Sequence, residues 1–215
     1  VRLVGSEMCI RDSIEPSKIL KGTLSAPEMK RIQRASDELE RLPIWIDERT
    51  DLSVADLRYQ ISLRRKQGRC EMVIVDYLQL MLSPSEDRKS TNDQISAITR
   101  QLKLIAKEND IPVVLLSQLN RESENRPGGR PELAHLRESG AIEQDADIVI
   151  LLYRPAMLHI PTDRESGYPT EGLGIIIVAK QRNGETGNAY FGHNPEMTKI
   201  TDYVPPLEFL LKHAK

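Results

Sequence analysis

Two apolar runs that each end in a polar residue flank an amphipathic segment, and this feature constrains the fold more than any other. The first run is 72–76, Met-Val-Ile-Val-Asp, and the second is 111–117, Ile-Pro-Val-Val-Leu-Leu-Ser. The segment 93–109 between them is expected to be a helix, because its apolar residues recur at helical spacing. These residues are Ile95, Ile98, Leu102 and Ile105. Strands that are apolar on both faces and joined by a helix predict a βαβ unit in a parallel sheet covered by helices.

Two helices and a strand are predicted before this unit. The pattern Ser25-Ala-Pro-Glu28 is typical of a capping box and predicts a helix over 25–42. A short strand is expected over 43–47. Ser53 then predicts the start of a second helix, which we expect to stop near Gly68.

After this unit the sequence predicts more strands. Two buried strands are expected over 147–153 and 173–180, and Asn183-Gly184 is a strong turn signal. Shorter antiparallel strands should follow to about Tyr203. The predicted fold class is therefore α/β, a mostly parallel sheet flanked by helices with short antiparallel strands near the C-terminus.

Composition excludes several classes of protein. A hydrophobic content of 39% can fill a core, and a net charge of −2 gives no overall field that attracts nucleic acid. Only 4% of residues are aromatic, which argues against a platform for stacking bases. Cys9 and Cys70 form no disulfide framework, so a reducing, cytoplasmic setting is expected. The four histidines are too scattered for a zinc site, and no apolar run approaches the roughly 20 residues of a membrane span.

Polar residues at strand ends are the candidate functional residues, because ligands of parallel α/β sheets bind beyond the carboxyl ends of strands. Asp76 and Gln118 stand at two such ends, and Arg154 and Lys180 at two others. A carboxylate can hold magnesium through water, and an amide can sense a terminal phosphate. The alternative is that Asp76 caps the following turn and Gln118 is a solvated loop residue.

Four strings resemble motifs of the DnaB family of replicative helicases, in the family's order. Ile74-Val-Asp76-Tyr-Leu-Gln-Leu80-Met resembles its Walker B segment, and Ser117-Gln-Leu-Asn-Arg121 its following motif. Leu136-Arg-Glu-Ser-Gly-Ala-Ile-Glu-Gln-Asp-Ala-Asp147 is similar to its DNA-loop motif, and Lys180-Gln-Arg-Asn-Gly184 to its finger motif. The resemblance covers roughly 15–203 and implies the RecA-like ATPase domain of such a helicase.

The resemblance implies roles in ATP chemistry. Asp76 would coordinate Mg²⁺ and Gln118 would contact the γ-phosphate of ATP. Lys180 and Arg182 would act in trans, reaching the ATP site of a neighbouring subunit. Without the resemblance, Lys180 and Arg182 are better explained as a solvated basic hairpin.

The resemblance also implies DNA contacts. Arg137, Glu138 and Gly140 would line a central channel and hold the backbone of single-stranded DNA. A glycine lets main-chain N–H groups approach phosphate, Arg137 supplies charge, and Glu138 would orient Arg137 or a neighbouring loop. The alternative is an ordinary helix end at Ser139-Gly140.

No P-loop is present in the 215 residues. That loop needs G-x-x-x-x-G-K-[ST], since its backbone amides cradle the phosphates and its lysine neutralises their charge. Gly167 and Gly172 have the spacing, but Leu173 stands where lysine is required. Gly187 and Gly192 are likewise followed by His193. We therefore expect a partial RecA-like domain, incomplete at its N-terminal side, that binds ATP poorly and hydrolyses almost none.

The predicted organisation has three parts. Residues 1–13 show no likeness to the family and resemble translated sequencing-adapter read-through, residues 14–203 form the partial helicase domain, and residues 204–215 form a tail. The leading hypothesis is a fragment of a hexameric ATP-driven helicase that moves on single-stranded DNA. Primase and a helicase loader are the partners implied by the family. Two alternatives are another RecA-like ATPase, and a non-catalytic module that docks on a helicase or primase ring.

Overall fold

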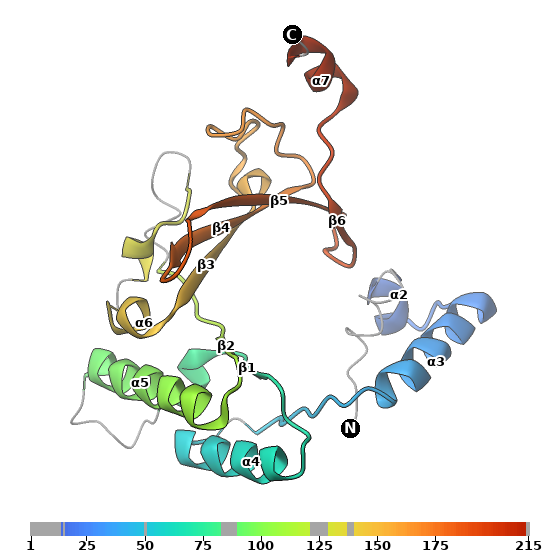
Figure 1. The fold of residues 1–215 in the computed structure, drawn as a ribbon. Helices are drawn as coiled ribbons and strands as arrows, with labels where there is room; N and C mark the ends of the chain where they lie inside the picture. Colours follow the sequence, from blue (N-terminus) through green and yellow to red (C-terminus); the bar gives the residue numbers. More distant parts are fainter. Residues whose placement is uncertain are drawn as a thin grey trace. The chain divides into compact units, whose positions relative to one another are not determined.

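The structure, a computed structural model, describes residues 14, 16–49, 51–82, 90–120, 129–136 and 140–213. The helices are α2 (Pro16–Leu20), α3 (Ala26–Glu40), α4 (Val54–Lys66), α5 (Thr91–Asn109), α6 (Gly140–Asp145) and α7 (Leu207–His213), with 3₁₀ turns η1 (Leu78–Met81), η4 (Leu133–His135) and η5 (Pro155–Leu158). The strands are β1 (Val73–Val75), β2 (Val113–Leu115), β3 (Ile148–Tyr153), β4 (Leu173–Gln181), β5 (Gly187–His193) and β6 (Ile200–Asp202) (Figure 1).

The chain divides into two compact units. Of the described residues, those within 1–47, 152–176 and 189–215 belong to unit 1, and those within 48–151 and 177–188 belong to unit 2.

The predicted βαβ unit is confirmed in unit 2. Strands β1 and β2 pair in parallel, with Val73 opposite Val113 and Val75 opposite Leu115. Helix α5 connects them (Figure 1). The helix begins two residues before the predicted start, because the Ser90 side chain accepts the N–H of Asp93 and caps it.

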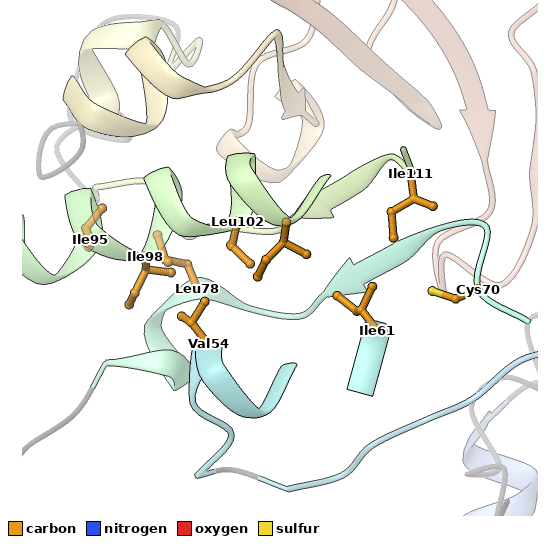
Figure 2. Close-up of a cluster of buried hydrophobic side chains, with 9 residues drawn as sticks. Val54, Ile61, Cys70, Leu78, Ile95, Ile98, Leu102 and Ile111 are labelled. Carbon is orange, nitrogen blue, oxygen red and sulfur yellow. The ribbon is translucent and has the colours of Figure 1, made fainter. Parts of the chain in front are cut away.

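The core of unit 2 lies between α4, α5 and one face of β1 and β2. Figure 2 shows Val54 and Ile61 of α4 in the same cluster as the apolar residues of α5. All four predicted core residues of α5 are buried there: Ile95, Ile98, Leu102 and Ile105. Leu78, which follows β1, is fully buried in this cluster. Its burial anchors the chain just after β1 and Asp76.

The expectation of strands covered on both faces is wrong for β1, β2 and β3, each of which has an exposed face. It is confirmed at the start of β4, where the consecutive residues Leu173, Gly174 and Ile175 are all buried. Ile74 and Val114 point away from the cluster, and their side chains are 63% and 44% exposed. On β3, Val149 and Leu151 are buried while Ile148 and Ile150 are exposed. Apolar side chains on both faces of a strand predict two layers of cover, but they do not say which segments supply the second layer.

The two predicted helices before the βαβ unit are present. Ser25 and Glu28 form the predicted capping box of α3, and Ser53 forms another with Asp56 at the start of α4. The predicted strand over 43–47 is wrong, since these residues have no regular secondary structure. A strand requires a partner backbone, and neither of the two sheets in the described residues includes this segment.

A second sheet holds four strands in the order β3-β4-β5-β6. The predicted turn at Asn183-Gly184 joins β4 to β5, and β5 pairs with β6 antiparallel as predicted. Within unit 1, Tyr168 contacts the rings of Tyr190, Tyr203 and Phe209 at centroid distances of 5.3 to 5.4 Å. Phe209 belongs to α7, so the segment that we predicted to be a tail contains a helix packed on this aromatic cluster.

Candidate functional site

The carboxyl ends of β1 and β2 bring Asp76 and Gln118 together. Backbone hydrogen bonds continue the pairing past the strands: Leu116 N–H donates to Val75 O, and Leu78 N–H donates to Leu116 O, both at 2.9 Å. The two ends therefore stay in register where the polar residues begin. Both Asp76 and Gln118 are exposed there. The peptide bond between Asp76 and Tyr77 is cis.

These ends border an open, solvent-exposed hollow of about 270 Å³ lined by Asp76, Tyr77, Leu116, Ser117 and Gln118. Two of the lining residues are those predicted from sequence to hold magnesium and to sense phosphate. One carboxylate is the donor that Mg²⁺ uses when water and nucleotide phosphates complete its shell. The lining includes no lysine or arginine among the residues that the structure describes, so this set suits the metal side of a nucleotide site and does not neutralise a triphosphate by itself.

Gln79 contacts a lining residue of the hollow, and the sequence did not predict this contact. Its Nε2 donates to Ser117 Oγ at 3.3 Å, which joins the segment after β1 to the end of β2. Its Oε1 is buried and has no hydrogen-bond partner within the described part of the chain. The family-like string contained Gln79, but nothing in that string indicated a contact 38 residues away.

Lys180 and Arg182 lie at the end of β4 and in the turn after it, and both contact α6 or the residues just after it. The Lys180 ammonium donates to the carbonyls of Glu143 and Ala146, the latter at 2.9 Å. The Arg182 guanidinium donates to Gln144 O at 3.1 Å. Neither cation lines the hollow at Asp76.

Asp147 interacts with three cations and was not singled out from the sequence. Its carboxylate forms ion pairs with Lys103 and, at 3.4 Å, with Arg182. The hydrogen bond from Lys103 lowers the pKa of Asp147 below its ordinary value, and the positive charges of Lys103, Arg182 and Lys107 lower it further. The carboxylate therefore stays ionised next to Arg182 at neutral pH.

Of the predicted DNA-binding residues, only Gly140 is described, because Arg137 and Glu138 lie outside the described residues. Gly140 is the first residue of α6. A Cβ placed on it would meet no heavy atom of the described residues within 4 Å beyond its chain neighbours and the backbone of its own helix, so this part of the structure does not require a glycine for packing.

Among the described residues, no three His, Cys, Asp or Glu side chains converge on a point that could hold a metal ion. None of the described helices is long and apolar enough to cross a membrane.

The family model for the DnaB-like helicase C-terminal domain matches residues 1–202. The chain belongs to the DnaB-like helicase C-terminal domain family. This match includes residues 1–13, which we expected to lie outside the family domain. The predicted domain boundary at residue 14 stays a prediction. The chain is 39% identical, over 194 residues, to a probable replicative DNA helicase of Trieres chinensis, covering 89% of this chain and 42% of that protein.

Solved structures of DnaB-like proteins have the same fold. One solved ATPase domain matches 93% of this chain and 70% of that chain, with a TM-score of 0.80 and 32% identity. A DnaB-like replicative helicase, described with its interactions with primase, matches 93% of this chain and 47% of that chain, with a TM-score of 0.81 and 30% identity. These matches confirm the predicted α/β class and the DnaB-like family. The chain spans less than half the length of the curated relatives it matches.

Proposed function

We propose that this chain is part of a replicative DNA helicase that couples ATP hydrolysis to movement along single-stranded DNA and to duplex unwinding. The observation that carries the proposal is the hollow at the ends of β1 and β2, where Asp76 and Gln118 stand together in a DnaB-like domain. An acid and an amide at adjacent carboxyl ends of parallel strands suit nucleotide chemistry.

Asp76 would hold Mg²⁺ through water, and Gln118 would contact the γ-phosphate of ATP. The phosphates themselves need backbone amides and a lysine, and the described lining of the hollow contains no lysine. The 215 residues include no P-loop, so we propose that this chain alone does not turn over ATP.

Lys180 and Arg182 would complete the ATP site of a neighbouring subunit in a homohexamer. Their absence from the lining of the hollow supports a role in trans. A cation of this kind is worth about 10³ to 10⁵ in rate in enzymes of phosphoryl transfer.

Single-stranded DNA would bind along Arg137, Glu138 and Gly140, in the central channel of the ring. A related helicase was solved with its interactions with primase, and we propose that this protein likewise works with primase and a helicase loader. We propose that the protein acts in the bacterial cytoplasm, at the replication fork.

The test uses the full-length helicase that carries this domain. Asp76→Asn should abolish ATP hydrolysis, because a neutral amide holds Mg²⁺ poorly, whereas Arg182→Ala should leave ATP binding intact and lower kcat. Asp51→Asn, an exposed acid that is absent from the hollow's lining, is the matched control. Fork unwinding by the wild type separates a helicase from other RecA-like ATPases. Normal turnover in both variants would remove Asp76 and Arg182 from the proposed catalytic residues.

A further inference from the structure

The stretch from α6 to Asp147 holds the turn that carries Arg182 by three separate contacts. The Arg182 N–H donates to Asp147 O at 2.8 Å, which fixes the backbone of the turn. The guanidinium then donates to Gln144 O and pairs with the Asp147 carboxylate. One short stretch of chain therefore fixes both the backbone position and the side-chain orientation of Arg182.

We propose that Asp147 is a positioning residue for Arg182, holding the guanidinium where it can reach the ATP site of a neighbouring subunit. This inference rests on the proposed function of Arg182 and adds a residue that does not itself touch the nucleotide. Side chains of Arg182 and Asp147 are 50% and 55% exposed, so the pair lies at the surface where a neighbouring subunit can be met.

The geometry leaves Arg182 able to bind phosphate. A guanidinium carries five N–H donors in a planar fork, and the contacts with Asp147 and Gln144 involve its two terminal nitrogens. At 3.4 Å the ion pair is a loose contact, which limits the angle of the side chain without enclosing it. A misplacement of about 1 Å costs on the order of 10²-fold in rate in well-oriented reactions.

Lys103 supplies the matched control. It lies on α5 and forms an ion pair with the same carboxylate, 44 residues away in sequence. If Asp147 only fastened α5 to the start of β3, removal of Lys103 would have the same effect as removal of Asp147. If Asp147 acts through Arg182, removal of Lys103 leaves the rate nearly unchanged, since the carboxylate still faces Arg182.

The experiment compares Asp147→Asn, Lys103→Gln, Arg182→Ala and the double variant Asp147→Asn/Arg182→Ala in the full-length helicase. Steady-state ATPase gives kcat and KM, and a fluorescent ATP analogue gives binding. Asp147→Asn should lower kcat by about 10- to 100-fold, with KM and binding unchanged within about twofold. It should have little further effect on the Arg182→Ala variant, because the two residues act as one unit. Asp147→Glu should restore part of the rate.

Three results would overturn the inference: normal kcat in Asp147→Asn, an equal loss in the Arg182→Ala background, or the same loss in Lys103→Gln. Thermal unfolding of each variant shows whether the fold is intact, and the Asp147→Glu variant decides the case if Asp147→Asn does not fold. Failure of the proposed function has a different signature. In that case Arg182→Ala itself keeps the wild-type kcat.

Discussion

The Nε2 of Gln79 donates a hydrogen bond to Ser117 Oγ at 3.3 Å, across the two strand ends that carry Asp76 and Gln118. The bond lies beside the backbone pairing between the Val75–Leu78 segment and Leu116. Ser117 also lines the hollow, so the hydrogen bond from Gln79 holds one of the residues of the candidate nucleotide site in place.

Ser117→Ala should therefore destabilise this edge. Removal of the hydroxyl leaves Gln79 Nε2 without this partner, and a typical hydrogen bond contributes about 0.5–1.5 kcal/mol to the free energy of unfolding. Urea unfolding of the chain measures this change. Ser96→Ala is the control, because Ser96 is exposed on α5 and donates only to a carbonyl of its own helix. Equal stability of Ser117→Ala and the wild type would show that the bond to Gln79 contributes nothing.

The βαβ unit was predictable because each of its signals is local. The spacing of Ile95, Ile98 and Leu102 reports the helical period within one segment, and the apolar runs beside it report two buried strands. Ser25 and Ser53 likewise identify their caps from residues three positions away. Asp76 and Gln118 followed from the same reasoning, since they only had to end neighbouring strands.

What the sequence did not predict depends on residues far apart in the chain. The contacts of Gln79 and Asp147 span 38 and 44 residues, and neither residue type indicates its partner. The incorrect strand over 43–47 has the same cause, because its apolar residues suggest a strand but no partner strand can be read from them. Similarly, the pattern at Ile74 and Val114 does not say which face of the sheet is covered.

The capping box of α3 should give part of this helix's stability a pH dependence. The hydrogen bond from Lys18 and those from Ser25 lower the pKa of Glu28 from 4.5 to about 2. A lowered pKa in the folded state means that the stabilisation is complete above pH 4.5 and is lost as the pH falls through about 2. NMR titration of the Glu28 carboxyl group and of the α3 amides measures both. Glu28→Gln should remove this pH dependence, and Glu40→Gln should keep it. A Glu28 midpoint near 4.5 contradicts the prediction.

Gly174 should not tolerate a side chain. A Cβ at this buried position of β4 would overlap the ring of Phe191 on β5, the neighbouring strand in the sheet. Overpacking of this kind costs about 1–3 kcal/mol, so Gly174→Ala should lower the free energy of unfolding by that amount. The second substitution Phe191→Leu should recover part of the loss. Gly187→Ala is the control, since a Cβ there meets no heavy atom within 4 Å in the described part of the chain. If both glycine variants unfold alike, Phe191 does not lie over Gly174 in solution.

The purified 215-residue chain should show no DNA-stimulated ATPase activity. The hollow at Asp76 and Gln118 contains the metal acid and the amide, but none of its described lining residues is a cation that could neutralise phosphate. A coupled assay with and without oligo-dT, with a full-length DnaB-like helicase as positive control, measures turnover. Substantial hydrolysis by the pure chain, retained after a second purification step, would mean that phosphate is held by residues other than a P-loop.

Gly140→Ala should weaken DNA binding without destabilising the fold. Gly140 leaves room for a Cβ with no packing contact within 4 Å among the described residues, so α6 accepts alanine and the melting temperature of the protein should not fall. If the backbone at Gly140 approaches a DNA phosphate, the new methyl group keeps that phosphate away. Loss of a hydrogen bond to a charged group costs about 1.5–3 kcal/mol, equivalent to about 10- to 100-fold in affinity for oligo-dT. Fluorescence anisotropy with the full-length helicase measures this change, and Gly187→Ala is again the matched control. Unchanged affinity in Gly140→Ala would remove this glycine from the proposed DNA-binding residues, while a parallel loss in Gly187→Ala would indicate a general effect on the domain.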